Sequence, residues 1–138
     1  MESRYELQRR LVSDPALSKI SAVSIDPAAM GGTGLTLKSP PFIRFLTQYV
    51  VPALQGISVM VAPNGPMRPT SKSAEDVLRA CFDTESLGEH PKALFLDGSA
   101  ISDSSKESHD VAKQKMLWTD SLKLAGIKEG DTVLKEWQ

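Results

Sequence analysis

The residues with the best chemistry for binding a ligand lie in a glycine-rich stretch near the start of the chain. A short β-branched run ends at Asp26-Pro27, and a Gly-Gly-Thr-Gly segment follows at 31–34. In open α/β sheets, ligands bind just beyond the carboxyl ends of the strands. Backbone N–H groups and the Thr33 hydroxyl could therefore cradle a polar group there, although a flexible linker is the interpretation that we favour. No Gly-Lys-Ser or Gly-Lys-Thr follows, which excludes a Walker-type phosphate loop.

Other side chains suited to catalysis or metal binding are scattered along the chain. Asp26, at the end of a predicted strand, is a weak candidate for a catalytic base, because an isolated aspartate there more often caps a turn. His90, His109 and Cys81 are far apart, so their spacing predicts no metal site. Cys81 on an apolar helix face is most simply a core residue.

The composition is typical of a globular protein that binds neither nucleic acid nor membranes. Among 138 residues there are 16 Lys and Arg and 17 Asp and Glu, a formal net charge of −1, so the positive charge needed to bind nucleic acid is absent. Hydrophobic residues make up 41%, which favours a packed domain. No apolar run approaches the roughly 20 residues that span a bilayer. The single cysteine cannot form an internal disulfide, and we therefore expect a cytoplasmic protein.

Periodicity and helix breakers predict an α/β fold. The expected helices span 2–13, 40–52, 73–86 and 109–125, and the expected strands span 20–25 and 93–97. Ser39 is the expected N-cap of the second helix, Ser73 and Asp76 form a capping box for the third, and Gly126 ends the fourth. Two parallel strands joined by a right-handed crossover would leave an open sheet edge, so we expect oligomerisation to complete the sheet.

Two of the predicted helices carry pronounced apolar faces. The 40–52 helix is apolar around much of its circumference, so it is either well buried or meets a partner or ligand. The 73–86 helix is expected to turn four side chains toward the core: Val77, Leu78, Cys81 and Phe82.

Four segments resemble, in the same order, parts of one enzyme family. They are residues 5–11, 23–27, 92–98 and 117–126. They are similar, in turn, to the rear of the catalytic helix, the sixth strand, the last strand and the C-terminal helix of short-chain dehydrogenases/reductases, particularly fungal, retinol-dehydrogenase-like members. The resemblance covers nearly the whole chain and corresponds to the family's C-terminal half. It implies a partial Rossmann-like fold, NAD- or NADP-dependent carbonyl reduction or alcohol oxidation as the parent chemistry, and a role in fungal secondary metabolism.

The same resemblance implies a single incomplete domain with three segments that have different roles. Residues 1–38 would supply a helix, a strand and the glycine-rich loop, residues 39–92 the substrate-side helices, and residues 93–138 the last strand and helix. The implied nicotinamide contacts are Pro27, Met30 and Thr33. The implied lining of an apolar substrate pocket is Phe42, Phe45 and Tyr49, for which ordinary core packing is the slightly favoured alternative.

The sequence departs from the family at the residues that perform its chemistry. The phosphate-binding Gly-x-x-x-Gly-x-Gly turn, the Asn-Ala-Gly strand, the catalytic serine and the Tyr-x-x-x-Lys motif do not occur in it. Tyr5 with Arg9 has the spacing of the last motif, but falls too late on the helix, and arginine differs from lysine in shape and hydrogen-bonding geometry. The Pro-Gly motif reads Pro27-Ala28, and a methyl group would crowd the backbone there. We expect the chain alone neither to bind NAD or NADP nor to transfer hydride.

Three functions are consistent with this pattern. The first is a truncated short-chain-dehydrogenase-like protein that is inactive without its missing half. The second is a cofactor-independent isomerase, cyclase or lyase that uses the remaining apolar pocket for a small apolar substrate. The third is a non-catalytic module that pairs its sheet edge in a homodimer or with a full-length relative.

Overall fold

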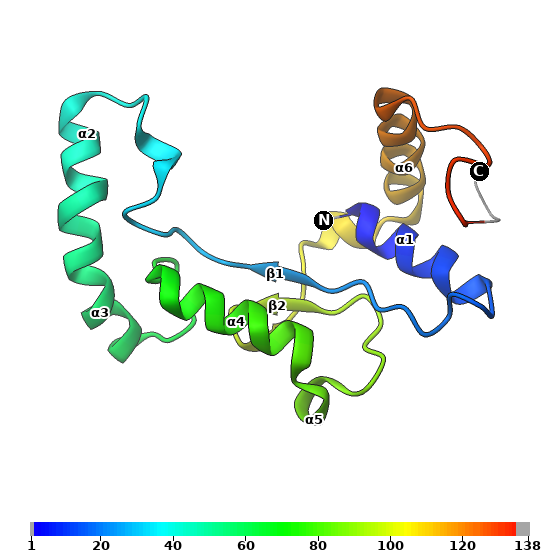
Figure 1. Cartoon of the computed structure of the whole chain (residues 1–138), viewed down its shortest axis with the longest axis horizontal. Helices are drawn as coiled ribbons and strands as arrows, with labels where there is room; N and C mark the ends of the chain where they lie inside the picture. The colour runs from blue at the N-terminus through cyan, green and yellow to red at the C-terminus, as the bar shows by residue number, and fades with distance from the viewer. Residues whose placement is uncertain (1, 135–138) are drawn as a thin grey trace. The chain divides into compact units, whose positions relative to one another are not determined.

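The computed structural model describes residues 2–134, and their contacts group them into two compact units (Figure 1). Of the described residues, unit 1 comprises 2–24, 84–95 and 102–134, and unit 2 comprises 25–83 and 96–101. The sequence predicted a single incomplete domain with three segments, 1–38, 39–92 and 93–138, and this division stays a prediction.

A three-stranded sheet has the strand order β1-β2-β3. The strands are β1 (Ser24–Asp26), β2 (Phe95–Asp97) and β3 (Ala100–Ser102). The Ser24 N–H donates to the Leu94 carbonyl at 2.9 Å and the Gly98 N–H to the Asp26 carbonyl at 3.3 Å, a register in which β1 and β2 run parallel. The α/β class and this parallel pair are confirmed. The expectation of two strands is wrong, because the chain turns at Gly98-Ser99 and adds β3 as a hairpin.

Strand β1 is shorter than the predicted 20–25 strand and begins four residues later. The side chain of Gln8 explains the difference. Its Nε2 donates to the Ile20 carbonyl at 3.1 Å and its Oε1 accepts the Ala22 N–H at 2.7 Å. These backbone groups are satisfied by a helix side chain, so the segment has no need of a strand partner.

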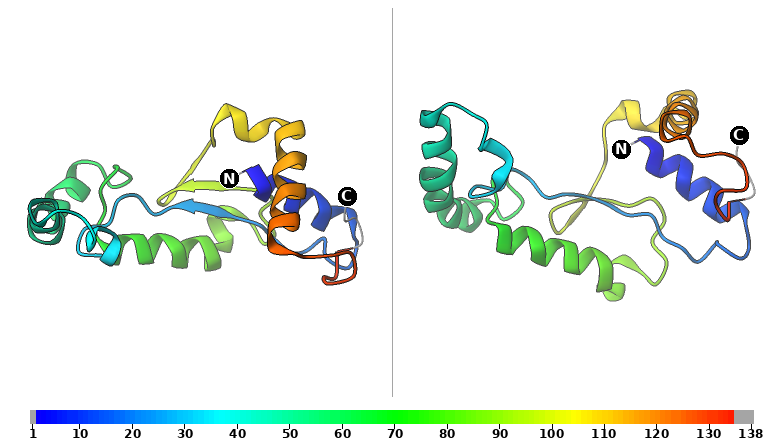
Figure 2. Two further views of the ribbon diagram at one scale, coloured as in Figure 1. Left: turned by 90° about the horizontal axis from the view of Figure 1, so that it is seen from above. Right: turned by 45° about the horizontal axis from the view of Figure 1, so that its top comes forward.

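In unit 1, helix α1 (Glu2–Ser13) packs beside α6 (Val111–Ala125), as both views of Figure 2 show. Helix α1 ends directly before the Asp14-Pro15 pair, as expected from the conformational restriction that proline places on its predecessor. A 3-10 turn, η3 (Lys106–His109), precedes α6. Helix α6 begins slightly later than predicted, since Asp110 is its N-cap, and Gly126 ends it with φ of 68°, as predicted.

The contact side of α1 is largely polar. Glu6, which is 2% exposed, accepts a hydrogen bond from Arg9 and another from Arg10 Nε at 2.9 Å. The Arg10 guanidinium also lies over the Trp118 ring, 5.0 Å from its centroid. The arginines paired with Glu6 therefore also reach α6, Arg9 through Gln114 and Arg10 through Trp118.

In unit 2, one long helix runs through α2 (Pro41–Phe45), the π-helical η2 (Leu46–Val50) and α3 (Val51–Val61) (Figure 1). The predicted end at Pro52 is wrong. The widened π-helical turn directly before α3 leaves Pro52 in the first turn of the next α-helical segment, where its missing N–H is tolerated. Ser39 is not the N-cap either: Pro40 occupies that position, and it makes no side-chain capping bond.

Helix α4 (Thr70–Phe82) starts three residues before the predicted helix, so Ser73 and Asp76 lie inside it and form no capping box. Both side chains are buried, at 3% and 1% exposure. The apolar face predicted to turn inward is instead exposed, at Val77 (42%), Leu78 (60%), Cys81 and Phe82 (76%). The hydrogen bonds of the buried Ser73 and Asp76 side chains, to the Pro27 carbonyl and from Lys72, therefore decide which side of this helix faces inward. The short helix α5 (Thr84–Leu87) follows in unit 1.

Apolar burial is sparse for a chain of this composition. Among the described residues, the buried hydrophobic side chains are Leu11 in unit 1 and Leu96 in unit 2. Hydrophobic burial is the dominant favourable term in folding, so hydrogen bonds and ion pairs carry an unusual share of the local order. Within residues 2–134, no helix is both long enough and apolar enough to cross a bilayer.

Candidate functional site

The loop after β1 opens with a turn that Asp26 caps. Its Oδ1 accepts the Ala28 N–H at 2.8 Å, with Pro27 between them. Ala28 has a φ of 58°, in the left-handed region that favours glycine. This is the position at which the Pro-Gly motif has its glycine. At Ala28 the backbone therefore keeps a glycine-like conformation while carrying a methyl group. The role of Asp26 as a catalytic base stays a prediction.

Replacing Ala28 with glycine is expected to raise the free energy of unfolding by about 0.5–1 kcal/mol. The relief of about 1–2 kcal/mol of left-handed strain is partly offset by the greater freedom of glycine in the unfolded chain. Urea unfolding at a fixed protein concentration measures the change. Ala29→Gly is the matched control, because Ala29 has no positive φ, and it should lower stability. A loss of stability in both variants would contradict the account.

The first two glycines of the loop allow it to pack against helix α3. A Cβ atom at Gly31 would lie 2.9 Å from Val51 Cγ1 and 3.0 Å from Pro52 Cδ. Gly32 has a φ of 74°, and its N–H donates to the Thr47 carbonyl at 3.1 Å. These glycines are explained by close approach and backbone geometry, and the Gly32 N–H is already satisfied within the unit.

A small, mainly apolar pocket of about 180 Å³ lies between this loop and the long helix. Its lining consists of Ala29, Met30, Gly31, Gly32, Thr33, Thr36, Thr47, Val51 and Met67. The Thr33 hydroxyl donates to the Met30 carbonyl at 3.2 Å. Met30 and Thr33 thus line one pocket, whereas Pro27 is not among the lining residues and its carbonyl accepts the Ser73 hydroxyl at 2.8 Å. Nicotinamide contact by all three stays a prediction.

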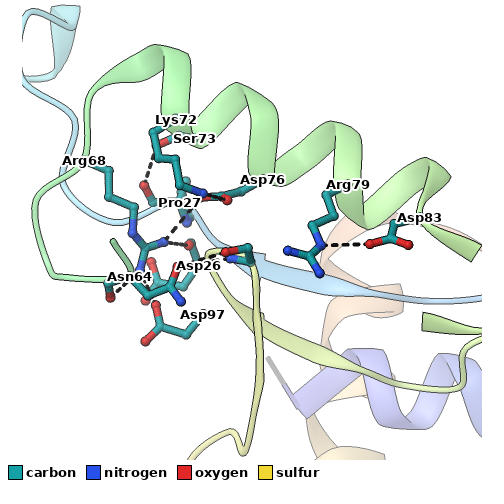
Figure 3. Close-up of polar contacts among 11 residues, drawn as sticks. Asp26, Pro27, Asn64, Arg68, Lys72, Ser73, Asp76, Arg79, Asp83 and Asp97 are labelled. Carbon is teal, nitrogen blue, oxygen red and sulfur yellow. Dashed lines mark hydrogen bonds and ion pairs between the residues drawn. The ribbon is translucent and has the colours of Figure 1, made fainter. Parts of the chain in front are cut away.

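A buried arginine, Arg68, organises the other side of the loop (Figure 3). It is 1% exposed, and its Nη1 donates to the Asp26 carbonyl at 2.8 Å. Its Nη2 donates to the Asn64 carbonyl at 2.7 Å and to the Asp97 carboxylate. One guanidinium thus joins the ends of β1 and β2 to the loop before α4, a task that suits its planar set of donors.

A second carboxylate completes the charge balance around this arginine. Asp76 is 1% exposed, and its Oδ1 accepts from Lys72. Its Oδ2 lies 4.0 Å from Arg68 Nη1 and, like Arg68 Nε, has no hydrogen-bond partner. The opposite charges offset part of the cost of burial. Arg68, Asp76 and Asp97 therefore form a cluster of opposite charges inside unit 2, in which Arg68 and Asp76 are buried.

A polar pocket of about 430 Å³ adjoins this cluster. Its lining consists of Asp26, Ala28, Ala29, Asn64, Gly65, Pro66, Arg68 and Asp97. Ala29 also lines the apolar pocket, and its isolated bridge to Met67 joins the two loops where the pockets meet. Two carboxylates beside a guanidinium have the chemistry to hold hydroxyl or amino groups.

The three aromatic residues proposed to line a substrate pocket do not lie together in one cavity. Phe45 and Tyr49 line a shallow pocket of about 260 Å³, and their ring centroids are 5.5 Å apart. Phe42 is not in its lining and is 70% exposed. The favoured interpretation of these residues as ordinary core is wrong, since Phe45 and Tyr49 are 56% and 65% exposed. Substrate contact stays a prediction.

In unit 1, Tyr5 and Arg9 engage different partners and do not act as a pair. The Tyr5 hydroxyl lies 2.7 Å from Ser104 Oγ, and Arg9 Nη2 donates to Gln114 Oε1 at 2.7 Å. The Tyr5 ring also contacts His109, with 4.9 Å between centroids. Within residues 2–134, no three His, Cys, Asp or Glu side chains come together as a metal site would require.

Comparison with known proteins tests the resemblance to short-chain dehydrogenases. Over 133 residues the chain is 45% identical to a Talaromyces variabilis protein named short-chain dehydrogenase iccH, a match that covers 96% of this chain and 36% of that protein. The relationship to short-chain dehydrogenases is confirmed. No family model matches the chain, and no solved structure matches it significantly. The chain thus spans about a third of the length of the curated short-chain dehydrogenase that it matches.

Relationship to short-chain dehydrogenases implies NAD or NADP as the cofactor of the parent family, yet the described residues do not fit a dinucleotide. The pocket lined by Met30 and Thr33 holds about 180 Å³, below the roughly 300–1,000 Å³ of ordinary ligand pockets. The Gly32 N–H donates to the Thr47 carbonyl of η2, and the Thr33 hydroxyl donates to the Met30 carbonyl within the loop. That pocket is too small for a dinucleotide, and the sequence holds no Gly-x-x-x-Gly-x-Gly turn to bind its diphosphate.

The sequence did not indicate the buried polar cluster of Arg68, Asp76 and Asp97. Arg68 lies in a turn-rich segment, where an arginine is ordinarily solvated. Its partners lie 4, 29 and 42 residues away along the chain. The one local signal was Lys72 four residues before Asp76, a spacing that pairs opposite charges on a helix.

Proposed function

We propose that this chain is the substrate-side part of a short-chain-dehydrogenase-like protein. The parent chemistry is NAD- or NADP-dependent carbonyl reduction or alcohol oxidation, and the chain alone does not perform it. The observation that carries the proposal is the 45% identity to a short-chain dehydrogenase along 96% of this chain.

The local geometry supports the inactive state. Hydride transfer to a carbonyl needs a positioned proton donor, and the sequence holds no Tyr-x-x-x-Lys motif. Tyr5 is hydrogen-bonded to Ser104, and Arg9 to Glu6 and Gln114, so this pair does not substitute for that motif. The chain would instead contribute the loop beside the nicotinamide ring and an apolar helix beside the substrate.

Calorimetric titration of the purified chain with NADPH and NADH tests the proposal. We expect no saturable binding at micromolar protein, because the sequence lacks the Gly-x-x-x-Gly-x-Gly turn that binds the diphosphate in the family. The Ala28→Gly variant is the matched control: it restores the glycine of the Pro-Gly motif and should bind no better. Micromolar affinity in the unchanged chain, or in this variant, would contradict the proposal.

A further inference from the structure

An exposed apolar stripe runs along one side of the α2–η2–α3 helix in unit 2. It consists of Phe42, Phe45, Tyr49, Ile57 and Met60, whose exposed fractions are 70%, 56%, 65%, 63% and 85%. Intervals of three, four, eight and three residues place these side chains along one face of a helix. Soluble proteins rarely leave a continuous apolar surface of this extent uncovered.

The opposite side of the helix anchors it to the rest of unit 2. Gln55 is 2% exposed, and its Nε2 donates to the Arg68 carbonyl at 2.9 Å. Val51 lies on the same side, directly against Gly31. On the exposed side, no atom lies within 4 Å of the Cβ position of Gly56, which leaves a notch for a side chain of another helix. The stripe is therefore free of the contacts that hold the helix in place.

The exposed apolar area of this helix matches that of a stable protein interface. Eight large side chains are at least 42% exposed: Phe42, Ile43, Phe45, Tyr49, Leu54, Ile57, Met60 and Val61. At about 150–250 Å² for a fully free aromatic side chain, Phe42, Phe45 and Tyr49 alone expose on the order of 400 Å², and the five aliphatic side chains on and beside the stripe add to this area. A standard interface buries about 800 Å² per partner, so one such surface suffices for one dimer contact.

The charges favour a second copy in the antiparallel orientation. Residues 27–74 contain no Asp or Glu, and Arg44 is the one charged residue of the 41–61 segment. The C-terminal end of a helix carries a partial negative charge. Antiparallel pairing places Arg44 near the carbonyl end of the other helix, whereas parallel pairing brings two arginines together. An antiparallel contact is also what a twofold axis across the helix generates.

We propose that the stripe pairs with the same stripe of a second copy in an antiparallel, twofold-symmetric dimer. The Phe42 end of one helix then meets the Met60 end of the other. Tyr49 and Ile57 lie between these ends. This inference does not rest on the proposed function: in the dimer, Phe42, Phe45 and Tyr49 would be covered by the second copy and not by a substrate.

Sedimentation of the unchanged chain tests for the dimer. We expect the mass of two chains at micromolar concentration, and at least a hundredfold weaker association for Tyr49→Asp, which would place an unpaired carboxylate in the contact. Leu124→Asp is the matched control, because Leu124 is an 89% exposed apolar residue outside the stripe. Circular dichroism of each variant checks that the helices remain. A monomeric unchanged chain, or equal weakening by both variants, would overturn the proposal.

Disulfide trapping tests the orientation in a Cys81→Ser background. In the antiparallel pair the two copies of residue 60 lie about 27 Å apart, at 1.5 Å rise per residue. Met60→Cys should therefore not cross-link with itself, but should cross-link when mixed with Phe42→Cys. Efficient self-linking of Met60→Cys would mean a parallel contact and would overturn the antiparallel dimer.

Flotation with vesicles of equal parts phosphatidylcholine and phosphatidylserine separates the dimer from lipid docking. The absence of acidic residues near the stripe makes an anionic surface the main competing occupant. Because the dimer covers the stripe, we expect no flotation of the chain with these vesicles. Flotation that Tyr49→Asp abolishes would assign the stripe to lipid instead.

Discussion

Replacing Arg68 with methionine is expected to lower the free energy of unfolding by about 3–5 kcal/mol, the usual cost of removing one partner from a buried charge network. Methionine fills similar space but donates no hydrogen bond. The Asp26 and Asn64 carbonyls would lose their guanidinium partner, and Asp76 would keep only Lys72. Since few apolar side chains are buried, a loss of this size should abolish the cooperative transition in urea at 25 °C.

Two further variants distinguish this effect from a general intolerance of substitution. Arg79→Met removes an arginine of helix α4, the helix that follows Arg68. The Arg79 side chain is 44% exposed and pairs with Asp83 at 2.9 Å. This substitution should cost no more than about 0.5 kcal/mol. Arg68→Lys should restore only part of the stability, because an ammonium lacks the planar donor set. An Arg68→Met midpoint close to that of Arg79→Met would contradict the central role of Arg68.

Gly98→Ala is expected to destabilise the chain by about 2–4 kcal/mol. Gly98 has a φ of 60°, and a Cβ atom there would lie 2.6 Å from Asn64 Oδ1 and 2.7 Å from Arg68 Nη1. Left-handed strain costs about 1–2 kcal/mol and overpacking a similar amount or somewhat more. The arginine has little freedom to retreat, because its guanidinium is bonded to Asp26 and Asp97 at the carboxyl ends of two parallel strands and to the Asn64 carbonyl.

Gly126→Ala is the matched control for this prediction. Gly126 has a φ of 68°, but no atom lies within 4 Å of its Cβ position. It should therefore show the strain alone, about 1 kcal/mol. Urea unfolding of both variants at one protein concentration isolates the crowding at Gly98. Equal losses in the two variants would mean that contact with Arg68 contributes nothing.

Local signals predicted the element boundaries that depend on backbone conformation alone. Asp14-Pro15 follows the end of α1 directly, and Gly126 ends α6 in the left-handed conformation. Both depend on steric restrictions within one or two residues of the boundary. These restrictions act wherever the element lies in the fold, so sequence reasoning captured them.

Other sequence signals gave wrong predictions, because contacts elsewhere in the fold can override them. Pro52 does not end its helix, because the π-helical segment before it accommodates the ring. Ser73 is not a cap, because its hydroxyl donates to the Pro27 carbonyl, 46 residues away. Polar anchoring of this kind also turned the apolar face of α4 outward, which the hydrophobic pattern alone could not reveal.

The predicted loop adjoins two pockets, and whether it binds a ligand stays a prediction. Asp26 does cap a turn at the end of β1, and Met30 and Thr33 do line a pocket. The polar side of the loop depends on Arg68, whose partners come together only when the sheet and α4 have formed. The expectation of self-association through a strand edge stays a prediction, and the helical stripe offers a larger apolar surface for it.

A crystal structure of the chain grown with excess NADPH tests the central claim most directly. The account predicts no dinucleotide bound along a single copy, with the Thr33 hydroxyl still directed to the Met30 carbonyl. An ordered NADPH whose diphosphate is held by residues of one copy would contradict it.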